Sequence, residues 1–248
     1  MIPVRADEAA LAAERREYLN RDYLNVDLSP WTLDRWVQRH AILKAVQSAL
    51  PSFSGTLLDV GCGYMPYRDM LVKPTGACDK YVGLDLHGNI YQKPDIAWDG
   101  ERIPLLDSSV DCAMATEVFE HCPDVELVLR ETLRVLKPKA PLFFTVPFLW
   151  PLHCVPHDEY RYTPFSLERH VRTAGFTAVQ MRPTGGWNAS LAQMIGLWVS
   201  RGPLTGFQRR VLSRLAVPVV QFLSRTDTVD TTFGESCMVT GLAGIAIK

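Results

Sequence analysis

The chain has 248 residues, a formal net charge of −1 and 47% hydrophobic residues. This composition is that of an ordinary globular protein, and it excludes a disordered or fibrous chain. A chain of this length fits one compact α/β domain with a small addition. The six cysteines are scattered without zinc-site spacing, so we expect reduced thiols and a cytoplasmic protein.

The N-terminal segment is charged and lacks the apolar stretch of a signal peptide. The longest apolar runs, Leu142–Leu152 and Leu215–Leu223, are interrupted by Pro or Gln. Both fall short of the roughly 20 residues that span a bilayer. We therefore expect no transmembrane helix.

The chain begins with two predicted helices, Asp7–Asn20 and Thr32–Leu50, the second behind a Ser29-Pro30 start signal. Short apolar runs then alternate with helical patterns, which is typical of βα units. The predicted strands are Thr56–Val60, Tyr81–Leu86, Ile96–Trp98, Asp111–Thr116, Leu142–Val146, Phe176–Arg182 and Met238–Ile247. The later predicted helices are Pro123–Leu136, Thr163–Ala174, Trp187–Arg201 and Leu204–Arg225.

This order predicts an α/β fold with a Rossmann-like, doubly wound, mostly parallel seven-stranded sheet and helices on both faces. We expect an N-terminal helical segment over residues 1–50 and a core over residues 51–186 plus 236–248. Residues 187–235 are expected to form a helical cap inserted before the last strand.

The first predicted strand runs into a glycine turn, Asp59-Val60-Gly61-Cys62-Gly63. Parallel sheets bind ligands at the carboxyl ends of their strands. Glycines there let the backbone approach a ligand closely, and a following helix N-terminus presents free N–H groups to an anion.

A second predicted strand ends in Asp85 about twenty residues later, where a carboxylate can accept both hydroxyls of a ribose. A dinucleotide fold would place a third glycine where this chain has Pro66. A nicotinamide or flavin cofactor is therefore disfavoured, and a nucleotide-binding oxidoreductase is kept only as an alternative.

Five blocks in order carry a resemblance to a known family. They are Leu57–Gly63, Val82–Asp85, Asp99–Pro104, Val110–His121 and Leu133–Pro138. Over residues 55–180 the chain resembles the class I S-adenosylmethionine-dependent methyltransferases of the type 11 domain. The third glycine of the first block is replaced by Met65-Pro66, so the turn is expected to differ locally.

The resemblance implies S-adenosyl-L-methionine as the cofactor. It implies that Gly61 and Gly63, with Cys62 between them, cradle the methionine part near Asp59. Asp85 is similar to the acid that binds the ribose.

The remaining implied cofactor contacts lie on later strands. Leu86 would pack on the adenine, Asp99 would read its amino group, and Gly100 would supply a backbone N–H. Thr116 and Glu117 would line the floor between cofactor and acceptor.

The segment after the fifth predicted strand, residues 146–164, concentrates two histidines, two acids, an arginine and four aromatic residues. Loops held by a rigid sheet often carry chemistry. The segment resembles a His-Asp-x-x-Arg-x-Thr-Pro stretch of bacterial methyltransferases, including ones thought to act on glycans. For a hydroxyl acceptor we expect His157 as general base, His153 as the alternate and Asp158 as the orienting group, with Arg161 or Tyr160 holding the acceptor.

The segment allows two other interpretations. His153 and His157 could bind a metal, but Pro156 breaks the helix that would align them, so a metal-free site is expected. Alternatively Asp158 and Arg161 could simply pair in a structural loop. His121 is expected to hydrogen-bond near the helix start at Pro123.

The predicted function is metal-independent, in-line methyl transfer to a small-molecule, glycan or lipid-linked acceptor, on oxygen. The alternative from another class is a cofactor-binding pseudoenzyme or adaptor. A nucleic-acid partner is not expected, because the net charge is −1 and no basic module is present.

Charge is uneven along the chain: residues 169–226 hold eight arginines and no Asp, Glu or Lys. One interpretation is a solvated basic cap whose apolar side covers the sheet. The other is a peripheral membrane contact through residues 187–225, where Arg201, Arg209, Arg210 and Arg214 flank apolar side chains.

Overall fold

A computed structural model describes residues 4–230 and 232–248 and contains a seven-stranded sheet with the order β3-β2-β1-β4-β5-β7-β6. β7 is antiparallel to its neighbours β5 and β6, and the other strand pairs are parallel. The sheet order reverses between β1 and β4, where open α/β sheets bind ligands. The predicted fold class is confirmed.

The strands are β1 Thr56–Val60, β2 Lys80–Leu86, β3 Ile96–Trp98, β4 Cys112–Thr116, β5 Pro141–Pro147, β6 Ala178–Pro183 and β7 Gly241–Ile247. The α-helices are α1 Val4–Leu19, α2 Trp36–Ala49, α3 Arg68–Leu71, α4 Val125–Val135, α5 Pro164–Thr173, α6 Trp187–Arg201 and α7 Gly206–Arg225. A π-helical turn, Asn20–Leu24, and two 3-10 turns, Leu50–Ser52 and Phe119–His121, complete the elements.

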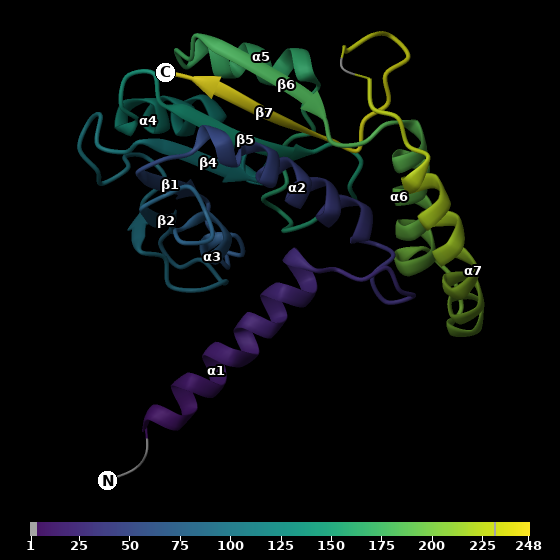
Figure 1. Ribbon diagram of the computed structural model, residues 1–248. Helices are drawn as coiled ribbons and strands as arrows, with labels where there is room; N and C mark the ends of the chain where they lie inside the picture. The colour runs from purple at the N-terminus through teal and green to yellow at the C-terminus, as the bar shows by residue number, and fades with distance from the viewer. Residues whose placement is uncertain (1–3, 231) are drawn as a thin grey trace.

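Helices cover both faces of the sheet (Figure 1). On one face α4 and α5 pack Leu129, Leu167 and Val171 against the strands. On the other face α2 packs Ile42 and Val46 against the sheet. β1 is buried along its length because both of its faces are covered.

Most predicted elements lie within a few residues of the observed ones, and the differences have local causes. α2 begins at Trp36 rather than Thr32, because the Thr32 hydroxyl oxygen accepts the Ser29 N–H at 2.9 Å and closes a turn. β7 begins at Gly241 rather than Met238, and the Thr240 carbonyl accepts the N–H groups of Phe148 and Leu149 instead of continuing the strand. The prediction of a helix from Asp7 to Asn20 is met by α1, which ends in the π-helical turn.

α6 and α7 form a helical hairpin that lies to one side of the sheet, between β6 and β7 in the chain (Figure 1). Asp227 caps the start of α6 by accepting the N–H groups of Gly186 and Ala189, both at 2.9 Å. The inner face of the hairpin packs on Leu33 and Val37.

Within the described part of the chain, no helix is long and apolar enough to cross a membrane.

Candidate functional site

The glycine loop after β1 is shaped by backbone conformations that favour glycine. Gly61 has φ +68° and Gly63 has φ +49°, and a Cβ at Gly61 would come within 2.6 Å of Val118. The loop is tied to β2, since the N–H groups of Gly61 and Cys62 both donate to the Leu84 carbonyl. Met65, which with Pro66 replaces the third glycine, is buried and has φ +52°.

Asp85 at the end of β2 is bonded to this loop. Its Oδ2 accepts the Gly63 N–H at 2.9 Å, and its Oδ1 accepts the Leu86 N–H at 2.8 Å. Each carboxylate oxygen has a further lone pair. The residue is therefore fixed in place and can still accept hydroxyl groups.

Leu86, Asp99 and Gly100 lie together at the ends of β2 and β3. Leu86 is 49% exposed, and a Cβ at Gly100, which has φ +89°, would lie 3.4 Å from the Leu86 side chain. Asp99 accepts the N–H groups of Glu101 and Arg102, and these two bonds lower its pKa. The arrangement leaves an apolar surface beside a fixed carboxylate, as an adenine site requires.

Asp59 is 1% exposed and accepts the Tyr81 hydroxyl, while its Oδ1 has no partner among the described residues. Burial raises the pKa of Asp59 to about 7, opposed by the bond from Tyr81. The unpartnered Oδ1 is the atom that could receive the amino group of a bound cofactor.

Thr116 ends β4, and Glu117 follows it with φ +55°. The Glu117 N–H donates to the Thr145 carbonyl, and its Oε2 accepts from Gln38 Nε2 at 2.8 Å. Burial raises the pKa of Glu117. A non-glycine residue in the left-handed region is a strained position of the kind found at functional sites.

The loop after β5 is fixed to the β4–α4 connection. The Glu120 carbonyl accepts the N–H groups of Glu159 and Tyr160, and the Tyr162 hydroxyl donates to the Phe119 carbonyl. The predicted acceptor loop therefore lies against residues that follow β4.

Within this loop Asp158 and Arg161 do pair. Arg161 donates to both Asp158 oxygens, at 2.7 and 2.9 Å, and this bond lowers the pKa of Asp158. Asp158 also accepts the His153 N–H at 3.0 Å and lies 3.2 Å from His153 Nδ1. Both terminal nitrogens of Arg161 donate hydrogen bonds to Asp158, so its side chain stabilises the loop after β5.

The two predicted histidines differ in their surroundings. Burial lowers the pKa of His153, an effect opposed by Asp158. His157 is exposed, and its ring makes no hydrogen bond or ion pair with any residue that the structure describes. Asp158 therefore contacts the alternate histidine, His153, rather than the ring of His157. Tyr160 is 40% exposed, with its hydroxyl donating to the Pro123 carbonyl.

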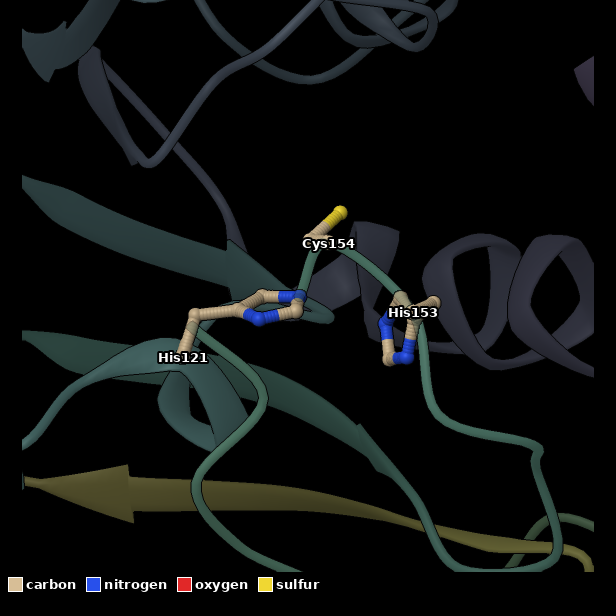
Figure 2. A group of neighbouring side chains, drawn as sticks. All are labelled: His121, His153 and Cys154. Atoms are coloured by element: carbon tan, nitrogen blue, oxygen red, sulfur yellow. The ribbon is translucent and has the colours of Figure 1, made fainter. Parts of the chain in front are cut away.

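The sequence did not indicate that Glu120 lies at this site, and it gave the wrong hydrogen-bond partner for His121. The His121 Nδ1 lies 2.6 Å from the His157 carbonyl, so His121 bonds across to the loop after β5 and not near Pro123. His121 and His153 stack edge to face with ring centroids 4.7 Å apart, and Cys154 lies beside them (Figure 2). Tyr91 was also missed: its ring faces Gly63 and its hydroxyl lies 3.8 Å from Cys154 Sγ.

Comparison with known proteins places this geometry in a family. A family profile described as a methyltransferase domain matches residues 58–144. A malonyl-acyl-carrier-protein O-methyltransferase of Methylococcus capsulatus is 26% identical over 148 residues, which cover 50% of this chain and 53% of that protein. Residues 58–144 therefore form a methyltransferase domain of the class I S-adenosylmethionine-dependent type. The chain spans about half the length of this curated relative.

Solved structures share the fold of this chain. A chain from the complex between the Haloferax volcanii Trm112 methyltransferase activator and a methyltransferase aligns with TM-score 0.56 and 18% identity, covering 96% of both chains. Phosphoethanolamine N-methyltransferase 2 of Haemonchus contortus, in complex with S-adenosyl-L-methionine, aligns with TM-score 0.52 and 11% identity, covering 94% of this chain and 60% of the other. At identities this low, the structural likeness shows the fold alone.

The cofactor of the family is S-adenosyl-L-methionine, and two features of the site fit it. The backbone at Gly63 is open, since a Cβ there would lie no closer than 3.8 Å to a neighbour, and Asp59 Oδ1 is buried without a partner among the described residues. When bound, the cofactor supplies a methyl group that its sulfonium has already activated. Asp85, Leu86 and Asp99, to which the resemblance assigns its nucleoside part, lie at the ends of β2 and β3.

Proposed function

We propose that this methyltransferase transfers a methyl group to an oxygen of a small-molecule, glycan or lipid-linked acceptor that enters against the loop after β5. The observation that carries the proposal is the position of Tyr91. Its ring packs edge to face on Tyr64, which directly follows Gly63, with ring centroids 5.1 Å apart, and its hydroxyl lies 3.8 Å from Cys154 Sγ. One side chain thus contacts both the cofactor loop and the predicted acceptor loop, so the two half-sites are neighbours.

Methyl transfer from a sulfonium is an in-line displacement, so the protein contributes alignment and exclusion of water. Holding the two reactants in near-attack geometry is worth on the order of 7–11 kcal/mol. Two hydrogen bonds position Glu117, which forms the floor between cofactor and acceptor. Gln38 Nε2 donates to its carboxylate, and its own backbone N–H donates to the Thr145 carbonyl. These contacts make the boundary between cofactor and acceptor rigid.

We assign proton removal from the acceptor hydroxyl to His157. Its ring is exposed and unengaged, while its backbone N–H donates to the Cys154 carbonyl at 2.9 Å and fixes the turn. Histidine suits this step, because its neutral ring accepts a proton near neutral pH. Asp158 and Arg161 position His153, and the exposed ring of Tyr160 is proposed to contact the acceptor.

The outer face of the α6–α7 hairpin favours an acceptor held at an anionic lipid surface. Large apolar side chains repeat at helical spacing along both helices and are 40–75% exposed. They are Trp187, Leu191, Met194, Trp198, Phe207, Val211, Leu215, Val219 and Phe222. A patch of this kind marks a site of interaction, since soluble monomers rarely expose one.

Four of the arginines of the hairpin divide into two groups. Arg201 pairs with Asp34, and Arg209 donates to the carbonyls of Val199 and Gly202, so these two are used inside the protein. Arg210 and Arg214 are exposed, and neither pairs with an acid that the structure describes. Each follows an exposed apolar residue by three positions, so charge and apolar surface share one face, as in helices that lie at membrane interfaces.

The proposed activity is tested by incubating the protein with labelled S-adenosyl-L-methionine and separate water-soluble and lipid extracts. We expect label in an acceptor, with mass spectrometry locating the methyl group on oxygen. A calorimetric titration with S-adenosylhomocysteine is run alongside. Tight binding without any methylated product would refute the activity and favour the adaptor alternative.

A further inference from the structure

Three side chains with metal-ligating atoms meet at the carboxyl end of β4 and β5. One ligand atom from each of His121, His153 and Cys154 lies within 4.8 Å of the other two. His121 comes from the turn after β4, whereas His153 and Cys154 come from the loop after β5 (Figure 2). The group is separate from the residues that fit S-adenosyl-L-methionine.

Each imidazole ring has an acceptor close to its Nδ1 atom: His121 is hydrogen-bonded there, whereas His153 lies at ion-pair distance from Asp158. Because a carbonyl can only accept, the 2.6 Å contact with the His157 oxygen fixes the proton of His121 on Nδ1. His153 Nδ1 faces Asp158, which Arg161 holds. Ring nitrogens anchored to a carbonyl or a carboxylate are characteristic of histidines that bind metals through the other nitrogen.

Glu120 supplies an independent observation. Its side chain is fully buried, and neither carboxylate oxygen has a hydrogen-bond partner among the described residues. Its Oε1 lies 3.7 Å from His121 Nε2 and 3.9 Å from His153 Nε2. An unpartnered buried carboxylate is costly unless a cation accompanies it, and this one points at the two free nitrogens.

We propose that His121, His153, Cys154 and Glu120 bind a divalent transition-metal ion of the zinc type. Two imidazoles, one thiolate and one carboxylate match the ligands that zinc takes in tetrahedral sites, whereas magnesium and calcium prefer oxygen. Tetrahedral ligands at zinc distances lie about 3.3–3.7 Å apart, so the three ligand atoms, now within 4.8 Å of one another, would draw together by up to about 1.5 Å. The proposal departs from the sequence expectation of a metal-free site, which considered His153 with His157.

The role of the ion, though not its binding, rests on the proposed function. The cluster lies beside Tyr91, between the cofactor loop and the exposed His157. There the ion would take the acceptor oxygen as a fifth ligand and lower the pKa of its hydroxyl. The proton passes to His157, the oxygen bonds to the methyl carbon, the carbon–sulfur bond breaks, and S-adenosylhomocysteine leaves.

The test titrates Co²⁺, a spectroscopic substitute for zinc, into the full chain after metal removal, with a phosphine reductant keeping the thiols reduced. We expect one Co²⁺ per chain, with a thiolate-to-cobalt charge-transfer band and visible bands typical of tetrahedral coordination. Cys154→Ser should abolish the charge-transfer band, and His153→Ala should weaken binding by at least about 100-fold. Cys237→Ser and His40→Ala serve as controls elsewhere in the chain and should change neither.

S-adenosylhomocysteine affinity, measured on every variant, verifies folding without requiring transfer activity. Glu120→Gln is a second variant, expected to weaken Co²⁺ binding while the thiolate band persists. The absence of bands at excess Co²⁺, or bands that survive Cys154→Ser, would overturn the site. Metal binding without methyl transfer would support the site and refute the proposed activity.

Discussion

The carboxylate of Asp85 accepts the backbone N–H of Gly63 at 2.9 Å, joining the end of β2 to the glycine loop after β1. The two residues are 22 positions apart in the chain. Since β1 and β2 are parallel neighbours, their carboxyl ends meet at one edge of the sheet. The bond lets Asp85 hold the loop, and we propose that its remaining lone pairs accept the cofactor's hydroxyls.

Asp85→Ala should weaken S-adenosylhomocysteine binding by roughly 1.5–3 kcal/mol, because charge-assisted hydrogen bonds are lost. Isothermal calorimetry measures the change. Asp79→Ala, an exposed acid before β2 that pairs with Lys73, is the control and should bind normally. Unchanged affinity in Asp85→Ala, with the fold intact, would remove Asp85 from the cofactor site.

Most residues of the predicted cofactor site could be found from the sequence because they lie at or next to the ends of predicted strands. Asp85, Leu86 and Asp99 each follow a short apolar run, so the parallel sheet alone brings them to one edge. The turn at Met65 could be expected to differ, but its left-handed backbone could not be derived from residue types.

The acceptor half-site was less predictable because its contacts join distant segments. The bond between His121 and the His157 carbonyl spans 36 positions. Glu120 was visible in the sequence as an acid, yet nothing local indicates that it is fully buried between two histidines. The pairing of Asp158 with Arg161, three residues apart, was the contact that spacing did suggest.

His157→Ala should lower the methyl-transfer rate by about 10²–10⁴-fold, because a general base is removed. S-adenosylhomocysteine affinity should stay within about twofold of wild type. The variant keeps the backbone carbonyl that His121 contacts, so the neighbouring cluster is preserved. Single-turnover assays with His40→Ala as the control measure the effect, and a large loss of cofactor affinity would place His157 on the other side of the site.

Asp59 should make stability depend on pH. Its pKa is raised by burial from 3.8 to about 7, so between these values the folded protein binds a proton that the unfolded chain has lost. The unfolding free energy therefore falls as pH rises from about 4 to about 7, then levels off. Asp59→Asn, which keeps an acceptor for Tyr81, should gain up to about 4 kcal/mol relative to wild type across this window.

Urea unfolding of both proteins at several pH values, without cofactor, measures this difference. The comparison cancels the titration of Glu117 and Glu120, whose pKa values are also raised by burial. A stability difference that does not change between pH 4.5 and pH 7.5 would show that Asp59 is ionised throughout.

From the exposed apolar and basic surface of the α6–α7 hairpin we predict that the protein binds anionic membranes. Vesicles containing anionic lipid should bind the protein in flotation assays, and neutral vesicles should bind it weakly. Each basic residue near an anionic surface contributes about 1 kcal/mol, screened by salt. Arg210→Glu combined with Arg214→Glu should therefore reduce binding by more than 10-fold, because attraction is replaced by repulsion at two exposed, unpaired positions.

The matched control combines Arg130→Glu on α4 with Arg169→Glu on α5, which changes the net charge equally on helices away from the hairpin (Figure 1). If the control loses binding as strongly, overall charge and not the hairpin face governs the interaction. If neither vesicle binds the wild-type protein, the apolar stripe from Phe207 to Phe222 serves another partner, and a water-soluble acceptor is favoured. Retention of binding in Arg210→Glu/Arg214→Glu at high salt would likewise contradict an electrostatic contact, since surface charges are then screened.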